Sequence, residues 1–140
     1  MIVYLDTSAL VKAYITEIST TEVLKTIKKA KVVSSHVFAY VEAHATFSRI
    51  KRENKISEKQ FESVKHSFNK DWLNYLRIES TPIMIQHAAD LADAFALRAY
   101  DSVHLAAADI LAKQSKQPII FACFDRQLNK AAAVLGLSLI

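Results

Sequence analysis

The stretch Ile2-Val3-Tyr4-Leu5, followed by Asp6-Thr7-Ser8, decides the fold that this sequence predicts. Four apolar residues in an unbroken run are typical of a strand that is buried on both faces. A carboxylate ends the run, and a helical pattern over residues 9–14 follows, which Thr7 or Ser8 can cap. Ligands of open α/β sheets bind outside the carboxyl ends of the strands. We therefore expect Asp6 at a binding site.

The rest of the chain alternates helical and strand patterns. Apolar spacing predicts helices that open near Thr20, His36, Ser57, Thr81 and Asp101, with a last one between Asp125 and Gly136. Strands are expected over residues 31–35, 76–80, 119–124 and 137–140, with 76–80 at an exposed edge. The segment that Asp101 opens is apolar nearly all round, which places it in the middle of a domain. This alternation predicts one α/β domain over residues 1–140 with a mainly parallel sheet.

Composition excludes several classes of protein. The chain has 140 residues, of which 51% are hydrophobic and 23% charged, as in an ordinary globular domain. No apolar run approaches the roughly 20 residues of a membrane span, and no signal peptide is evident. The single glycine, Gly136, rules out the glycine-rich loops that bind nucleotide phosphates. Cys123 has no partner for a disulfide, which favours a cytoplasmic location.

Four acids carry the candidate chemistry. Asp6 and Asp125 each end a predicted buried strand, so parallel strands would bring both carboxylates to one edge of the sheet. Glu42 and Asp101 lie in otherwise apolar helical segments, where a charged side chain needs compensation. A divalent cation between the four would supply it. Oxygen ligands suit Mg²⁺ or Mn²⁺, whereas the lone Cys and the scattered His argue against zinc.

Each acid also has a plainer interpretation. Asp125 and Asp101 precede or open helices and can be simple N-caps, while Glu42 can face solvent. For Asp6 a cap role is less expected, because Thr7 or Ser8 is available for it. Three further residues are candidates for substrate contact, namely Ser8, Arg49 and Arg98. His104 is expected to be a hydrogen-bonded core histidine rather than a general base.

Four motifs in order resemble the PIN-domain ribonuclease family, especially the VapC-like toxins of toxin–antitoxin pairs. They are Tyr4 to Lys12 around Asp6, Glu42 in its helix, Leu97 to Ala106 around Asp101, and Phe124 to Leu128 around Asp125. The resemblance implies a five-stranded parallel sheet flanked by helices, with the four acids as catalytic residues around Mg²⁺ or Mn²⁺. It also implies endonucleolytic cleavage of RNA and a cognate antitoxin that blocks the site.

The chain departs from the family pattern at two places. Cys123 stands where many members have Thr or Ser, which removes a hydroxyl that can orient an acid. The sequence Glu17-Ile18-Ser19 lacks the glycine that often follows the first helix. Neither change touches the four acids, so they bear on the tuning of the site.

Two other functions compete with a metal-dependent endoribonuclease. A phosphatase resembling the haloacid dehalogenases would use Asp6 as nucleophile, but its Asp-x-Asp motif has Ser8 at the second acid here. A non-catalytic binding module would not need all four acids. Apolar residues of the first helix, namely Leu10, Ala13, Tyr14 and Ile15, are expected to offer a groove for an antitoxin helix. We also expect a homodimer, and a basic segment between Arg49 and Lys70 that holds the RNA backbone.

Overall fold

The computed structural model describes residues 1–140 and contains one five-stranded sheet in the order β3-β2-β1-β4-β5, with every pairing parallel. The strands are β1 (Ile2–Leu5), β2 (Val32–His36), β3 (Leu76–Ile78), β4 (Ile119–Ala122) and β5 (Ser138–Leu139). The helices are α1 (Thr7–Lys12), α2 (Thr20–Lys29), α3 (Ala39–Arg52), α4 (Glu58–Trp72), α5 (Pro82–Phe95), α6 (Ala99–Gln114) and α7 (Arg126–Val134). The predicted α/β fold with a parallel sheet is confirmed.

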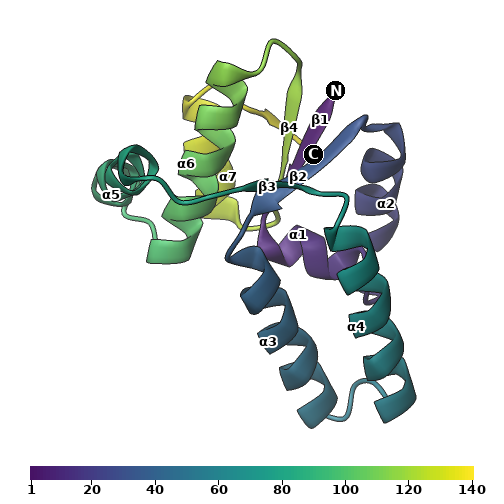
Figure 1. Cartoon of the computed structure of the whole chain (residues 1–140). Coiled ribbons are helices and arrows are strands. Elements are labelled where there is room, and N and C mark those ends of the chain that lie inside the picture. Colours follow the sequence, from purple (N-terminus) through teal and green to yellow (C-terminus); the bar gives the residue numbers. More distant parts are fainter.

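Strand β1 is the centre of the sheet, and its side chains alternate between two cores. Ile2 and Tyr4 pack on one face with α5, α6 and α7, whereas Val3 and Leu5 pack on the other with α1 to α4. Figure 1 shows the sheet between these two groups of helices. All four residues are buried, as the unbroken apolar run predicts. The predicted central helix is α6, whose residues from His104 to Asp109 are buried.

Helices α3 and α4 form a hairpin that projects away from the sheet (Figure 1). Its second helix begins with the expected capping box, in which the Ser57 hydroxyl accepts from the N–H of Gln60 and the Gln60 side chain accepts from the N–H of Ser57. Thr81 caps α5 by accepting from the N–H of Met84, with Pro82 in the first turn. Gly136 follows the end of α7 with a φ of +81°, a value that favours glycine.

Three sequence expectations are wrong in detail. Helix α1 begins at Thr7, and its cap is Asp6 itself rather than Thr7 or Ser8. Asp101 lies in the first turn of α6 and is not its cap. Leu10 is buried in the core and so cannot line a groove, whereas Ile15 borders a surface hollow with Tyr14 and Thr16. The two capping errors arise because local pattern alone does not fix the residue at which a helix starts.

No helix of the structure is both long and apolar enough to span a bilayer.

Candidate functional site

The turn between β1 and α1 fixes Asp6 at the carboxyl end of the central strand. Its Oδ1 accepts hydrogen bonds from the N–H of Ala9 at 2.8 Å and from the hydroxyl of Ser8 at 2.7 Å. The residue is only 5% exposed. Asp6 therefore stabilises the start of α1 and at the same time presents its other oxygen at the edge of the sheet.

Asp125 occupies the equivalent place after the neighbouring strand. Because β1 and β4 pair with Leu5 opposite Ala122, the two aspartates leave the sheet at the same edge. Oδ1 of Asp125 accepts from the N–H of Leu128 at 2.8 Å, so Asp125 caps α7. Its own N–H donates to Sγ of Cys123 at 3.2 Å. The thiol thus takes an acceptor position that a hydroxyl at residue 123 would also fill.

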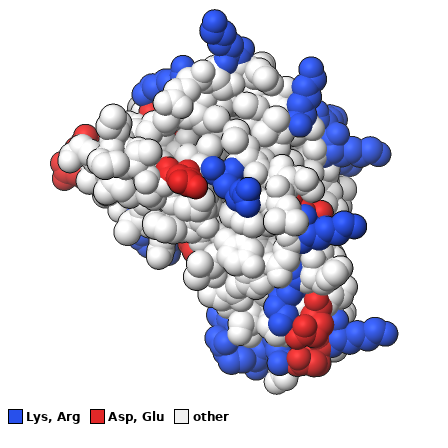
Figure 2. Space-filling view, in the orientation of Figure 1, with Lys and Arg blue, Asp and Glu red and all other residues white.

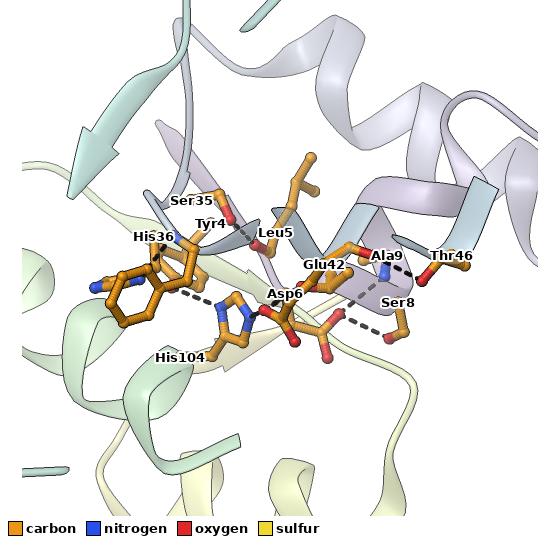
Figure 3. Close-up of polar contacts among 12 residues, drawn as sticks. Tyr4, Leu5, Asp6, Ser8, Ala9, Ser35, His36, Glu42, Thr46 and His104 are labelled. Carbon is orange, nitrogen blue, oxygen red and sulfur yellow. Dashed lines mark hydrogen bonds and ion pairs between the residues drawn. The ribbon is translucent and has the colours of Figure 1, made fainter. Parts of the chain in front are cut away.

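Glu42 reaches this edge from the first turn of α3. Its Oε1 accepts a 2.8 Å hydrogen bond from Oγ1 of Thr7 and lies 3.1 Å from Nε2 of His104. The hydroxyl of Tyr4 in turn contacts Nδ1 of His104 at 2.9 Å. His104 is 3% exposed, so it is the hydrogen-bonded core histidine that the sequence predicts. Figure 3 shows Asp6, Glu42 and His104 turned toward the same region.

Asp101 comes from the first turn of α6 and is paired with an arginine. Nε of Arg98 donates to its Oδ2 at 3.1 Å, across one turn of the chain. Arg98 is 82% exposed along its side chain, whereas Asp101 is 22% exposed. The hydrogen bond to Asp101, and then the charges of Asp101 and Asp125, raise the pKa of Arg98, so the guanidinium lies within the fields of both acids.

The four acids lie at the caps or in the first turns of α1, α3, α6 and α7, but they do not form a closed ligand group. No set of three or more His, Cys, Asp or Glu side chains is close enough together to hold a metal ion. Each carboxylate uses one oxygen within the protein. No N–H or O–H group donates to the second oxygen of any of these carboxylates. The four free oxygens are Oδ2 of Asp6, Oε2 of Glu42, Oδ1 of Asp101 and Oδ2 of Asp125. This all-oxygen donor set fits Mg²⁺ or Mn²⁺.

The pKa values of buried neighbours report the negative field of these acids. Burial raises the pKa of the Cys123 thiol, and the charge of Asp6 raises it further. Burial and then the charge of Asp6 likewise raise the pKa of Tyr4. For Glu42, burial raises the pKa, but the hydrogen bond and charge of His104 outweigh it and hold the pKa below its usual value. The carboxylate of Glu42 is therefore kept ionised.

The candidate substrate contacts lie beside the acids. Ser8, Arg49 and Lys12 line a hollow of about 240 Å³ together with Thr7 and Thr46. The charge of Lys12 is not unpaired, because its Nζ lies 3.0 Å from the carboxylate of Glu17. Arg49 lies on the Glu42 face of α3, and its side chain is 60% exposed, with Glu53 at 3.8 Å.

Acidic side chains neutralise part of the positive charge of the segment between Arg49 and Lys70. Figure 2 shows Lys and Arg mixed with Asp and Glu at the far end of the α3–α4 hairpin. Lys51 pairs with Glu58, and Lys55 lies 3.0 Å from Glu53. Nζ of Lys65 lies 2.9 Å from Glu62. These pairs leave less unbalanced charge for a phosphate backbone than the count of basic residues suggests.

A second surface feature is an apolar groove of about 440 Å³ that opens between α1, α2 and the end of α4. Ala13 and Tyr14 line it as expected, together with Leu24 and Ile27 of α2. Tyr75 and Asp71 close its other side, and the Tyr14 hydroxyl donates to Asp71 at 3.0 Å. The groove is therefore mostly apolar, with Lys31, Asp71 and Asn74 as the polar residues of its lining.

Two members of the site escaped sequence reasoning. The sequence predicts Thr7 as a cap, yet it binds Glu42, a residue 35 positions away. It predicts Cys123 as a lost hydroxyl, yet the sulfur accepts the N–H of Asp125. Only the nearness of Thr7 to Asp6 and of Cys123 to Asp125 signals these contacts in the sequence, and nearness does not reveal a partner.

Comparison with known proteins assigns the family. The PIN domain model matches residues 3–134. Ribonuclease VapC45 and Ribonuclease VapC49, from two strains of Mycobacterium tuberculosis, are each 30% identical over 96% of this chain and 92% of their own length. A similar fold occurs in VapBC2 from Rickettsia felis bound to a promoter DNA fragment, with a TM-score of 0.66 and 15% identity over 100% of this chain and 98% of that one. FitAcB from Neisseria gonorrhoeae has a TM-score of 0.66 and 13% identity over 99% of this chain and 96% of that one. The chain belongs to the PIN domain family.

Proposed function

We propose that this chain is a metal-dependent endoribonuclease that hydrolyses RNA phosphodiester bonds and acts as the toxin of a toxin–antitoxin pair. One observation carries the proposal. Four carboxylates lie at the starts of α1, α3, α6 and α7, and each has an oxygen to which no N–H or O–H group of the protein donates. The names of the two mycobacterial relatives support the ribonuclease activity, and VapBC2 as a structural neighbour supports the pairing.

Asp6, Glu42, Asp101 and Asp125 are the proposed catalytic residues and would hold Mg²⁺ or Mn²⁺. The bound cation would supply positive charge that stabilises the phosphate and favours attack by water. The chain itself holds the acids in place. Backbone N–H groups fix Asp6 and Asp125, while Thr7 and His104 fix Glu42. Because these bonds exist before a substrate binds, the carboxylates need little reorganisation.

The basic and hydroxyl groups at the rim are proposed to place the RNA. Arg98 lies beside Asp101 with its guanidinium in solvent, and Arg49 opens onto the hollow that Ser8 lines. A guanidinium can hold two oxygens of one phosphate at once. The two arginines would therefore hold phosphates on either side of the acids.

The antitoxin is proposed to bind the apolar groove and insert a cation among the acids. An amphipathic helix of the partner can lay its apolar face along Leu24 and Ile27. An arginine or lysine from the partner would then compete with the metal for the free carboxylate oxygens. Because coupling between two ligands is reciprocal, saturating Mn²⁺ should weaken partner binding as much as the partner weakens Mn²⁺. Equal partner affinity with and without metal would refute the inserted cation.

The phosphatase alternative is disfavoured by the surroundings of Asp6. A nucleophilic carboxylate needs an oxygen directed at phosphorus and a nearby acid for the leaving group. Here Ser8, at the position of that acid, donates its hydroxyl to Asp6. We also propose a homodimer, for which Ile83 and Ile85 on α5 offer exposed apolar surface, at 79% and 45% exposure. Sedimentation of the purified protein tests it.

A cleavage assay tests the class of enzyme. Purified protein is incubated with a labelled single-stranded RNA, the same sequence as DNA, and a phosphomonoester, each with Mn²⁺ or with EDTA. The proposal expects Mn²⁺-dependent internal cleavage of the RNA and none of the phosphomonoester. Release of phosphate from the monoester would favour the phosphatase, and no reaction with any substrate would favour the binding module.

A further inference from the structure

Phe38 and Tyr100 are the two exposed aromatic residues of this chain, and they touch each other. Of its 7 Phe, 5 Tyr and 1 Trp, only these two are exposed, at 41% and 55% of their full area. Their ring centroids lie 6.3 Å apart with the planes at 87°. The other aromatic rings lie in the core or are partly covered, so this pair is the one exposed aromatic feature of the surface.

The pair lies one helical turn from the candidate acids. Phe38 precedes Glu42 by four residues at the start of α3, and Tyr100 precedes His104 by four residues in α6. Residues four apart share a helix face. Since Glu42 and His104 are 3.1 Å apart, the two helices bring the aromatic pair together one turn further toward their N-termini. Figure 1 shows both helices beginning on the same side of the sheet.

The neighbours of the pair fit one nucleotide of RNA. Tyr100 adjoins Asp101, and the exposed Arg98 binds that acid at 3.1 Å. An aromatic face beside a guanidinium offers stacking for a base and a charge-assisted contact for its phosphate. Because the two rings are nearly perpendicular, one planar base can stack on one ring and meet the other only at an edge. The arrangement suits a single base rather than a base inserted between two rings.

We propose that Phe38 and Tyr100 hold one unpaired base of the RNA next to the phosphate that is cut. This inference rests on the ribonuclease function proposed above and specifies its substrate as single-stranded at that nucleotide. Stacking tolerates every base, since each has a flat π-face, so the pair selects for an unpaired base and not for its identity. A base inside a duplex is stacked on its neighbours and cannot reach the pair.

Single-turnover cleavage separates binding from chemistry in the test. Tyr100→Ala should raise the half-saturating protein concentration about 5- to 100-fold, as loss of one stacked base predicts, with a smaller change in the maximal rate. Tyr100→Trp should restore binding. The matched control is Leu73→Ala, which removes a side chain of 71% exposure from the end of α4. It should leave both parameters unchanged.

An RNA-side change completes the test. One abasic nucleotide is moved along the substrate, and at one position next to the cut it should weaken binding to the wild-type protein but not to Tyr100→Ala. A cleaving wild-type protein whose binding is insensitive to both changes would overturn the aromatic contact while leaving the nuclease intact. If the wild-type protein cleaves nothing, quenching of 2-aminopurine in bound RNA still decides the contact. Dissociation of a dimer by Tyr100→Ala would instead assign the pair to an interface between copies and overturn the proposal.

Discussion

Thr7 and Glu42, which lie 35 positions apart, are joined by a 2.8 Å hydrogen bond from Oγ1 of Thr7 to Oε1 of Glu42. The bond connects the turn after β1 to the first turn of α3, so it sets the position of one proposed metal ligand relative to another. A second bond to Oε1, from His104 at 3.1 Å, comes from α6. Three segments of the chain therefore converge on one carboxylate oxygen.

Replacing Thr7 tests whether this bond positions Glu42. Thr7→Val keeps the shape and removes the hydroxyl, so it should lower the cleavage rate about 10- to 100-fold, as expected for one hydrogen bond to a charged group. The matched control is Thr46→Val, because Oγ1 of Thr46 binds the backbone carbonyl of Glu42 rather than its carboxylate. Equal rates for the two variants would show that the Thr7 bond does not position the acid. Rates come from single-turnover cleavage.

Replacing Asp6 by Asn separates its two roles. Asn caps a helix about as well as Asp, so α1 should remain stable, while the lost charge should abolish Mn²⁺ binding and RNA cleavage. Calorimetric titration with Mn²⁺ and thermal unfolding measure the two effects. Without metal, the melting temperature should rise, because one of several neighbouring carboxylates is neutralised.

A cap variant elsewhere controls for helix stability. Ser57→Ala removes the cap of α4 and should cost about 1 kcal/mol of stability without changing cleavage. Cleavage by Asp6→Asn at the wild-type rate would end the metal-site hypothesis.

His36 should make the folded protein less stable in mild acid. Burial, and then the charge of His104, lower its pKa to about 4, with Glu42 acting in the opposite sense. Nδ1 accepts the N–H of Phe38, which requires the neutral ring. Since the histidine of an unfolded chain titrates near ~6.5, the unfolded state binds more protons between about pH 6.5 and 4. The free energy of unfolding therefore keeps the full contribution of the neutral His36 above pH 6.5. It falls by up to roughly 3 kcal/mol as the pH is lowered toward 4.

Urea unfolding at pH 7 and pH 5 measures this loss. His36→Asn offers an oxygen near the position of Nδ1 and carries no titrating group, so its stability should change less between the two pH values. His66→Asn serves as the control, because His66 is exposed in α4. An identical pH response of wild-type and His36→Asn proteins would contradict the assignment.

Salt dependence tests the basic groups. For binding to single-stranded RNA, the removal of one phosphate contact flattens the slope of log affinity against log salt by roughly 0.7. Arg49→Gln should flatten the slope by about that amount, since Arg49 opens onto the hollow beside the acids.

The triple change of Lys51, Arg52 and Lys55 to Gln would flatten the slope by about 2 if all three contacted phosphates. We expect less, because Lys51 and Lys55 pair with acids and Arg52 binds Ser48 within α3. Fluorescence anisotropy at several salt concentrations gives both slopes. A larger effect of the triple variant than of Arg49→Gln would place the main RNA contact at the far end of the hairpin, around Lys51 to Lys55.

A charge in the apolar groove should separate the toxin from its partner. Leu24→Glu places a carboxylate where an apolar helix face is expected, so partner affinity should fall at least tenfold while cleavage of free RNA is unchanged. Ile18→Glu is the control, since Ile18 is 89% exposed and does not line the groove. Equal affinity of the two variants for the partner would place its helix elsewhere.

The fold followed from the sequence because its signals are local. Alternating helical and strand patterns, the Ser57–Gln60 capping box, Thr81-Pro82 and Gly136 each depend on a few neighbouring residues, and the structure confirms them. The start of α1 did not follow, since Asp6, Thr7 and Ser8 are all good caps. Only the position of the Ala9 N–H selects Asp6 among them.

The candidate site was less accessible to sequence reasoning. Asp6 and Asp125 could be placed at one sheet edge from strand order alone. The contacts of Glu42 could not, because Thr7 and His104 meet it only after three segments pack together. The aromatic pair was missed for a similar reason. Phe38 and Tyr100 look like ordinary core positions until their exposure is known.

The central place of β1 in the sheet also sets the order in which the protein can become active. Ile2 pairs with Ile119, so β1 needs β4, a strand that the ribosome makes more than a hundred residues later. At about 5–20 residues per second, on the order of ten seconds separate the synthesis of Asp6 from that of Asp125. A nascent chain therefore carries three of the four proposed ligands without a complete site. A nuclease built this way cannot cut RNA beside its own ribosome until the segment that carries Asp125 has been made.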